Sequence, residues 1–223
     1  STNAGFNIQD STKITIKDSS LLENTAKGVS VLDSSNISFE SNTFDKNVEA
    51  GISFSDSHAI RINGGEIIID SAAADESVGI DINNLCSDYT IEGVQFTGDS
   101  LDNYGLDASC SDALEQSMFL YDLEDSFSYN LVIDSLVPFF NLTIGDSTFG
   151  KIDFIESFVG TIGGTDLGSL VKVGNNSAFV DSSNAPEFNK EAVITLYGLP
   201  TDWENTEIQV DGQTCPEPLC VPI

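Results

Sequence analysis

Short runs in which apolar and polar residues alternate recur along the chain, separated by polar breaks. Residues 28–47 contain two such runs, Val29–Val31 and Ile37–Phe39, and then a single apolar residue, Phe44. Alternation over three or four residues predicts a short β-strand with one buried face. The Asp-Ser pair at 33–34 predicts a turn, because both side chains can bond nearby backbone amides. The segment is therefore expected to hold three short strands and three turns.

The same pattern recurs along the chain at a fixed spacing. The aligned positions are Gly5, Gly28 and Gly51, the Asp-Ser pairs at 10–11, 33–34 and 56–57, and Leu21, Phe44 and Ile67. Further copies begin at Gly79 and Gly105, and looser alternation follows at 131–133, 140–144, 152–155 and 170–173. A repeat of about 23 residues indicates a solenoid. A lone hairpin needs no such match, and leucine-rich repeats need leucines where this chain has Ile, Val and Phe.

The repeat predicts an all-β fold, a single-stranded right-handed parallel β-helix with about 23–28 residues per coil. Coils stacked at about 4.8 Å place like residues above like. Two core ladders are expected, Phe6, Val29, Ile52, Ile80 and Leu106 in one and Ile8, Val31, Phe54, Ile82 and Ala108 in the other. Asn24 above Asn47 is expected to form a short asparagine ladder in a turn.

Two parts of the chain depart from the repeat. Residues 111–125 carry apolar residues at helical spacing, which leaves a short helix and a longer, irregular coil as alternatives, with the coil favoured. Near Asn184 the repeat ends, and strand patterns at 192–197 and 207–210 precede Cys215 and Cys220. We therefore expect a β-helix over 1–186 and a small β/Cys module over 187–223, acting as a cap or as a docking module between subunits.

Four cysteines, Cys86, Cys110, Cys215 and Cys220, are consistent with two disulfides, although four cysteines allow three pairings. Metal binding is the alternative, but the chain has no C-x-x-C spacing and its one histidine, His58, lies far from any cysteine. Cys86 and Cys110 fall in the same turn of adjacent coils, so a bridge between them is expected, worth about 3 kcal/mol. Disulfides predict an extracellular setting. The sequons at Asn36, Asn141 and Asn175 give weak support for a glycosylated surface protein.

A formal net charge of −28 argues against nucleic acids and anionic lipids as binding partners. Nucleic acids and anionic lipids need basic residues to neutralise their phosphates, and the chain has eight basic residues against 36 acidic ones. The scattered acidic residues indicate a solvated surface, or one that holds Ca²⁺ or other cations between subunits. No apolar run approaches the roughly 20 residues of a membrane span. The Ser-Thr-Asn start suggests a processed chain or a fragment.

Two segments resemble known proteins. The repeat at residues 28–47 resembles the right-handed parallel β-helix repeats of the pectate-lyase-like and NosD-like superfamily. This resemblance extends over roughly residues 4–180 and is strong only to about residue 108. The segment VITLYGLPTDWENTEIQVDGQTCPEPLC, residues 193–220, resembles a short module that follows such β-helices in archaeal cell-surface proteins. In those relatives the chain continues beyond the second Cys. The resemblance implies an envelope location.

Candidate sites for an enzyme of this kind are sparse. Related polysaccharide lyases pair Ca²⁺-binding carboxylates with a basic residue, and this chain has one arginine, Arg61, which is expected on the surface. Asp81 and Asp107 occupy the same outward position of adjacent coils and are weak candidates for a calcium site. The paired Asp and Gly-His-Gly motifs of polygalacturonases are absent, and His58 is expected in a surface turn. Four tyrosines are candidates for an outward aromatic surface: Tyr89, Tyr104, Tyr121 and Tyr129.

These features favour a structural role over an enzyme, with no catalytic residue and no cofactor. We expect a subunit of a surface layer, sheath or filament that associates with copies of itself through its faces and ends. The alternative is a glycan-binding or polysaccharide-cleaving protein at the cell surface, which requires a groove lined by aromatic residues and carboxylates. A third alternative is an accessory surface domain that presents one face to a partner protein.

Overall fold

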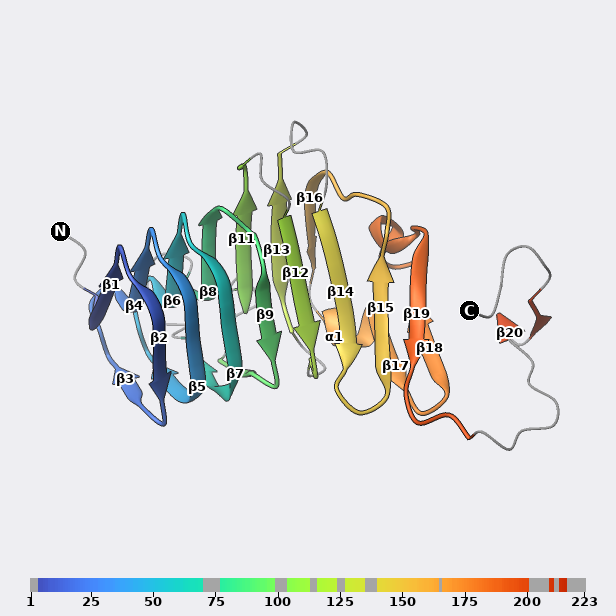
Figure 1. Ribbon diagram of the computed structural model, residues 1–223, viewed down its shortest axis with the longest axis horizontal. Coiled ribbons are helices and arrows are strands. Elements are labelled where there is room, and N and C mark those ends of the chain that lie inside the picture. The colour runs from blue at the N-terminus through green and yellow to red at the C-terminus, as the bar shows by residue number, and fades with distance from the viewer. Residues whose placement is uncertain are drawn as a thin grey trace.

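The computed structural model describes residues 4–69, 77–98, 104–112, 116–123, 127–134, 140–164, 166–200, 209–210 and 213–215. Its strands form a right-handed β-solenoid of about five turns. Two long sheets face each other across one core, and the coils advance from the N-terminal end to the right in Figure 1. The predicted fold class is therefore confirmed.

Within the described residues, seven strands form the first sheet. In spatial order they are β1 (Phe6–Gln9), β4 (Lys27–Leu32), β6 (Ala50–Ser55), β8 (Val78–Asn84), β11 (Leu106–Cys110), β13 (Tyr129–Ile133) and β16 (Gly160–Gly164). All neighbours are parallel up to β13. The last pair, β13 and β16, is antiparallel.

The second sheet faces the viewer in Figure 1. Its path is β2 (Thr12–Lys17), β5 (Ser35–Asp45), β7 (His58–Ile68), β9 (Tyr89–Glu92), β12 (Gln116–Tyr121), β14 (Phe140–Asp146), β15 (Gly150–Phe154) and β19 (Ala192–Leu196). Two short strands, β3 (Ser20–Leu22) and β10 (Gln95–Thr97), pair with the far halves of β5 and β7. The predicted third strand of each coil thus belongs to this sheet, joined to the second strand through a bend.

Both predicted core ladders are present. Phe6 pairs with Val29, Val29 with Ile52, Ile52 with Ile80 and Ile80 with Leu106, and the second ladder runs likewise from Ile8 to Ala108. At the centre of the core, the fully buried Phe54 meets the rings of Phe39 and Tyr89 edge to face, with centroids 6.0 and 5.5 Å away. The core is therefore a continuous column of stacked side chains from coil to coil.

Polar ladders link the turns in the same way. The Ser34 hydroxyl donates to the Leu32 carbonyl (2.7 Å) and accepts from the Ser11 amide of the preceding coil (3.1 Å). The Asn24 side chain and amide both donate to Asn47 Oδ1, at 2.8 and 3.2 Å, so the predicted asparagine ladder is confirmed. These bonds satisfy backbone groups that the tight turns leave without a strand partner.

The recurrent glycine of each coil is explained by close approach of the backbones. A Cβ on Gly28 would lie 2.5 Å from the Gly51 carbonyl oxygen, and one on Gly51 would lie 2.8 Å from that of Gly79. Real Cβ atoms do not come this close to a carbonyl oxygen, so neighbouring coils would have to separate. The repeat of glycine therefore reflects the tight stacking of coils.

We accordingly expect Gly28→Ala to lower the free energy of unfolding by about 1–3 kcal/mol, because the added methyl group overpacks a rigid contact. Chemical denaturation of the purified chain measures this loss. The matched control is Ser30→Ala, two residues away on the outward side of β4, which should change stability little. Equal stability of Gly28→Ala and the unchanged chain would contradict the stacking argument.

Residues 116–121 form strand β12 rather than a helix. Met118 and Leu120 are buried while Ser117 and Phe119 are partly exposed, which is a period of two. The helical alternative for 111–125 is therefore wrong for this segment, and the irregular coil is correct there. Residues 113–115 and 124–125 lie outside the described residues.

The parallel coils end at β14, earlier than the sequence predicted. The segments at 152–155 and 170–173, expected as further coils, instead form antiparallel pairs: β15 with β14, and β17 (Val171–Gly174) with β18 (Ser177–Val180). The turn between β14 and β15 spans only residues 147–149. Such a connection closes a hairpin, whereas a parallel partner needs a longer crossover.

The C-terminal end of the core is closed by a cluster of rings. Phe158 and Phe188 pack against Phe154 with centroids 5.6 Å away in each case, and the short helices α1 (Leu167–Leu170) and η1 (Pro186–Phe188) hold buried residues at this end. The boundary predicted at 186/187 stays a prediction. However, β19, which that prediction placed in the C-terminal module, pairs with β15 in the second sheet. Beyond it, β20 (Gln209–Val210) and β21 (Gln213–Thr214) form a small hairpin.

Candidate functional site

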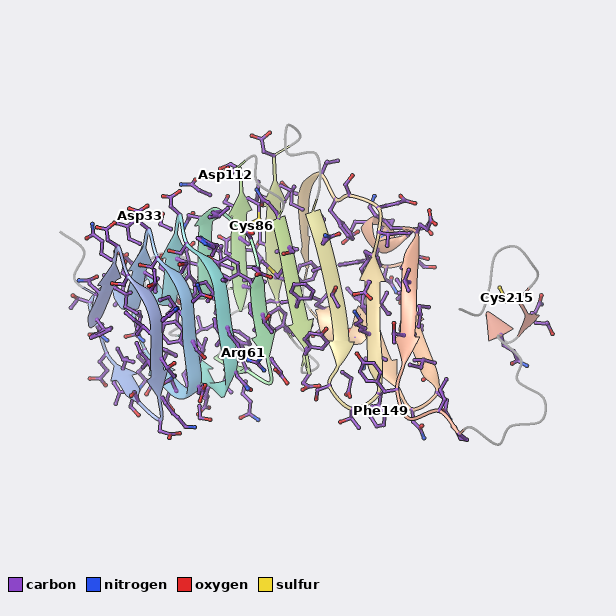
Figure 2. The ribbon with its side chains drawn as sticks, in the orientation of Figure 1. Asp33, Arg61, Cys86, Asp112, Phe149 and Cys215 are labelled. Atoms are coloured by element: carbon purple, nitrogen blue, oxygen red, sulfur yellow. A yellow bond between two sulfur atoms is a disulfide. The ribbon has the colours of Figure 1, made fainter. Side chains whose placement is uncertain are left out.

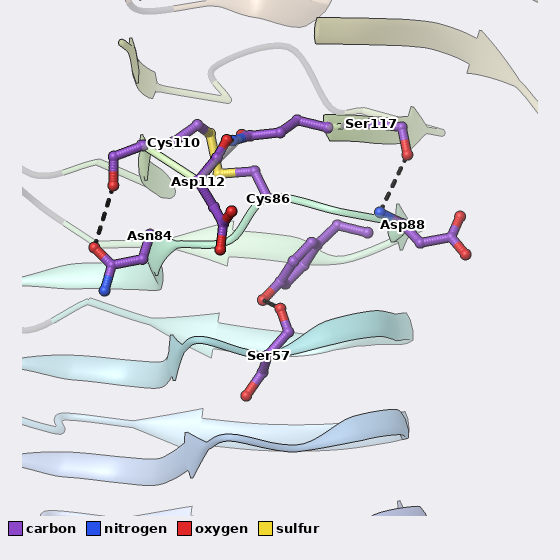
Figure 3. Close-up of a disulfide and its surroundings, with 10 residues drawn as sticks. Ser57, Asn84, Cys86, Asp88, Cys110, Asp112 and Ser117 are labelled. Atoms are coloured by element: carbon purple, nitrogen blue, oxygen red, sulfur yellow. Dashed lines mark hydrogen bonds between the residues drawn. A yellow bond between two sulfur atoms is a disulfide. The ribbon is translucent and has the colours of Figure 1, made fainter. Parts of the chain in front are cut away.

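The predicted bridge between Cys86 and Cys110 is present, with 5.4 Å between the two Cα atoms. Figure 3 shows the bridge between neighbouring coils. Three residues after Cys86, the buried Tyr89 donates its hydroxyl hydrogen to the Ser57 carbonyl at 2.9 Å. Burial raises the pKa of Tyr89 far above its ordinary value, and the carboxylates of Asp56 and Asp81 act in the same direction. The disulfide and this hydrogen bond join neighbouring coils, and the groups that form them are buried. Cys215 is also disulfide-bonded, and Cys220 lies outside the described residues.

Asp81 and Asp107 are neighbours in the first sheet, as predicted. The Asp81 carboxylate accepts from Ser53 Oγ and Asn83 Nδ2, both at 2.8 Å, and Lys27 Nζ lies 3.9 Å away. Asp107 accepts from Asn130 Nδ2 at 2.8 Å. Among the described residues, no group of three or more His, Cys, Asp or Glu side chains is placed to hold a metal ion. A calcium ion at Asp81 and Asp107 therefore stays a prediction.

Arg61 and His58 lie on the surface, as expected. Arg61 projects from β7 on the outer face of the second sheet (Figure 2), where its guanidinium is 2.8 Å from Glu92 Oε2. Its side chain is 55% exposed. His58 is exposed at the beginning of β7. Neither residue meets a second group that would activate it for catalysis in the part of the chain that the structure describes.

Two of the four tyrosines expected to face outward are buried, so that expectation is wrong for them. Tyr89 pairs with Ile60 and Tyr129 with Leu106, which are inward positions of the coil. The Tyr129 hydroxyl reaches Glu187 at 3.5 Å, and burial raises its pKa. Tyr104 and Tyr121 are partly exposed. Register with the earlier coils would have identified the two buried rings.

The partly exposed Tyr121 is the centre of a surface that we call the tyrosine patch: Phe119, Tyr121, Lys151, Asp153 and Tyr197, on the outer face of the second sheet. The Tyr121 ring lies over Gly145 of the next strand, because a Cβ there would be 2.8 Å from Cε1 of the ring. Lys151 Nζ lies 2.9 Å from Asp153 Oδ2, and Thr143 donates to Asp153 Oδ1 at 2.7 Å. The patch combines an aromatic surface with an oriented ion pair.

Charges and hydrogen bonds within the patch shift the pKa values of Tyr121 and Lys151. Partial burial raises the pKa of Tyr121, an effect that the positive charge of Lys151 opposes. The hydrogen bond to Asp153 raises the pKa of Lys151. The sequence did not single out Lys151, Asp153 or Tyr197, although alternation at 150–154 places the first two on the outward side of β15.

A small pocket of about 140 Å³ lies nearby, lined by residues that include Asp122, Asp146 and Lys172. Both carboxylates accept hydrogen bonds from residues of the turn between β14 and β15. Asp122 accepts from the Ser147 amide and hydroxyl at 2.8 Å, and Asp146 accepts from the amides of Thr148 and Phe149 at 2.8 and 2.9 Å. These bonds fix the hairpin turn whose tip, Phe149, is labelled in Figure 2.

The three sequons occupy different settings. Asn36 is exposed near the beginning of β5, with φ of 54°, and Asn175 is exposed in the turn of the β17–β18 hairpin. Asn141 is half-buried within β14. The first two are accessible to a glycan-transferring enzyme, and glycosylation at all three sites stays a prediction.

Comparison with known proteins gives one result. A family model described as the right-handed β-helix region matches residues 1–117. No curated protein and no solved structure matches the chain significantly. No helix within the described ranges is long and apolar enough to cross a membrane. The match covers just over half of the chain and agrees with the observed solenoid, so the chain belongs to the right-handed β-helix family.

Proposed function

We propose that the protein is a structural subunit of an extracellular assembly and associates with copies of itself. Proteins of this family include both enzymes and non-enzymes, so the fold does not decide between them. The observation that carries the proposal is that, among the described residues, the two sheets end in β16 and β19, each of which pairs with a neighbouring strand on one side only. Unpaired strand edges are templates for pairing with another chain.

Two further features support this role. The coils are joined by core ladders, by hydrogen bonds between turns and by the Cys86–Cys110 bridge, which makes a stiff rod. The disulfide is typical of proteins from oxidising compartments, and it supports an extracellular location.

Negative-stain electron microscopy of the oxidised chain at increasing concentration tests the proposal, and we expect ordered oligomers or polymers. The same preparation should be incubated with neutral and acidic polysaccharides, whose chain length is then measured. A strictly monomeric protein that shortens a polysaccharide would overturn the structural role.

Glycan binding is a second candidate function, favoured by the tyrosine patch. Sugar rings present apolar C–H faces that stack on aromatic rings, and their hydroxyl groups bond well to an ion pair such as Lys151–Asp153. The glycine under Tyr121 allows the ring to lie along the sheet rather than stand upright on it. An extended glycan could therefore cross β12, β14 and β15.

If this second function holds, Tyr121→Ala should weaken binding of a polysaccharide by about tenfold, the loss expected from one aromatic contact of about 1.5 kcal/mol. Affinity electrophoresis in gels containing neutral or acidic polysaccharides measures the change in mobility. Tyr104→Ala is the matched control, since Tyr104 is also partly exposed but lies outside the patch. Equal retardation of the Tyr121→Ala and Tyr104→Ala chains would argue against binding at the patch.

A further inference from the structure

The outer side of the second sheet carries two rows of side chains. Each strand from β2 to β9 directs two side chains outward between turn residues of positive φ, and β12, β14 and β15 continue the same alternation. The pairing register aligns these positions from strand to strand, so that one row runs from Thr15 on β2 to Asp153 on β15 and the other from Lys17 to Lys151. These two rows form a surface that we call the two-row face, and it is turned to the viewer in Figure 1.

The two-row face carries no net charge, although the chain as a whole has a formal charge of −28. Each of its basic residues lies close to a carboxylate of the same face: Lys17 to Glu40 (3.2 Å), Arg61 to Glu92 (2.8 Å) and Lys151 to Asp153 (2.9 Å). Each row taken alone also holds as many basic as acidic residues. The excess of acidic residues therefore lies elsewhere on the chain, and two copies that meet through this face bring little like charge together.

Exchanging the two rows brings complementary side chains together. A two-fold axis that runs along the solenoid between the rows makes this exchange, because each residue then meets the other outward residue of the same strand in a second copy. On β15 the axis places Lys151 against Asp153 of the second copy, and on β12 it places Phe119 against Tyr121. Both contacts occur twice, once on each side of the axis.

The remaining strands of the face create no contact between like charges under the same exchange. On β2, β5, β7 and β9 one of the two outward residues is charged and the other is Thr, Ser or Asn, as with Arg61 and Asn63 on β7. On β14 both are uncharged. Each charged side chain thus meets a small polar group that can form a hydrogen bond with it.

The other symmetric way to superpose the two faces is unfavourable. A two-fold axis along the central strand β9 would reverse the order of the strands in the second copy. It would place Lys17 against Lys151 and Glu92 against itself. Like charges opposed across an interface weaken binding strongly, so the axis along the solenoid is the one that the charges favour.

The two-row face also supplies apolar surface. Phe119 and Tyr121 are partly exposed on β12, and aromatic residues are enriched in protein interfaces. The Tyr121 ring lies low over Gly145, because a Cβ at that glycine would be 2.8 Å from Cε1 of the ring. A second sheet can therefore approach to about 10 Å, the usual distance between packed sheets, and cover both rings.

We propose that a second copy of this chain docks on the two-row face, so that the two solenoids lie side by side about a two-fold axis along their length. Such a contact uses the same surface on both copies and closes on itself. The inference rests on the proposed self-association and names a surface for it besides the strand edges. Because the contact covers most of the tyrosine patch, a docked copy and a bound glycan exclude each other there.

Lys151→Glu tests the charge matching across the contact. It sets acidic residues of one copy against acidic residues of the other at two places, so the dissociation constant measured by sedimentation velocity should rise at least about tenfold. The control is Lys46→Glu, which changes the net charge equally at an exposed turn residue outside the face. The preceding coil holds Glu23 at the same position with the same φ of 52°, so the fold tolerates this change.

The control should leave the dissociation constant within about twofold at about 0.15 M salt, where charges more than about 8 Å apart are largely screened. A swapped chain with Lys151→Asp and Asp153→Lys retains the ion pair on β15 and again sets a lysine against an aspartate across the axis. It should associate as the unchanged chain does. A swapped chain that keeps the circular dichroism spectrum of the unchanged chain and associates as weakly as Lys151→Glu would overturn the charge matching.

Cross-linking tests the direction of the axis. A short bismaleimide should link Thr15→Cys chains into dimers, because an axis along the solenoid keeps β2 of one copy against β2 of the other. An axis along β9 would instead separate the two β2 strands by the length of the face. The control is Gln9→Cys, which is exposed in the same coil but on the outer side of the first sheet, and it should stay unlinked. Linkage of Gln9→Cys but not of Thr15→Cys would overturn the inference.

The sequon at Asn141 gives an independent test. Asn141 lies on the outer side of β14, two residues before Thr143 of the two-row face, and a glycan there would cover the face. We therefore expect mass spectrometry of the natively produced protein to find Asn141 unmodified. A glycan on this residue would contradict docking through the face.

The outcomes separate the inference from the function on which it rests. If the chain assembles but Lys151→Glu and Lys46→Glu weaken association equally, the two-row face is not the interface, and the proposed self-association stands. If the unchanged chain stays monomeric at every concentration, both proposals fail.

Discussion

Replacing Phe54 by alanine is expected to lower the free energy of unfolding by about 3–5 kcal/mol. The ring is fully buried in the third coil, and it makes edge-to-face contacts with Phe39 in the preceding coil and with Tyr89 in the following one. Removing it leaves a cavity at a point where three coils meet. Neighbouring coils cannot close that cavity, because the β-ladders hold them at a fixed spacing.

Urea denaturation followed by tyrosine fluorescence and by circular dichroism measures this loss. Phe179→Ala is the control, since the same side chain is removed from a largely exposed position. Its stability should change by less than about 1 kcal/mol. Similar losses for the two variants would mean that the stacked rings do not form the centre of the core.

Removing the Cys86–Cys110 bridge is expected to cost about 3 kcal/mol, because the bridge closes a loop and restricts the unfolded chain. The two cysteines have a sequence separation of 24. The double variant Cys86→Ala and Cys110→Ala is the appropriate change. Both positions are fully buried, so serine would add the cost of a buried hydroxyl group. The loss should appear as a lower denaturant midpoint. Reduction, which also opens the bridge of Cys215, should lower the midpoint at least as much.

Two results would contradict this account of the bridge. An unchanged midpoint in the double variant would mean that the bridge is not formed in the folded protein. A lower midpoint in the double variant, with no change of the midpoint on reduction, would mean that the stability is lost because the packing of the sulfur atoms is lost.

Most of the solenoid could be predicted because the repeat fixes the register. The match of Gly5, Gly28 and Gly51 aligns the coils, and alternation then assigns Val29, Val31 and Phe54 to the core. The same register brings Cys86 and Cys110 near one another in neighbouring coils, where Cys110 at the end of β11 pairs with Asn84. A repeat of constant length constrains each position several times over, which a single strand pattern does not.

The C-terminal half of the described solenoid was less predictable because its contacts are not periodic. The change to antiparallel strands depends on a short turn held by Asp146, and alternation alone is the same for parallel and antiparallel strands. The cluster of Phe154, Phe158 and Phe188 joins side chains that share no repeat position. The tyrosine patch was missed for a similar reason, since it joins β12 to β15 and to residues after β19.

The central claim is that copies of the chain associate. The mass of the particles in solution, measured at several protein and salt concentrations, tests this claim most directly. With a net charge of −28, copies repel one another at low ionic strength. Salt shortens the range of that repulsion to about 8 Å at about 0.15 M. We predict that the mass rises above 23.8 kDa with increasing concentration and that added salt strengthens the association. A mass that stays at 23.8 kDa at every concentration and salt level would contradict the account.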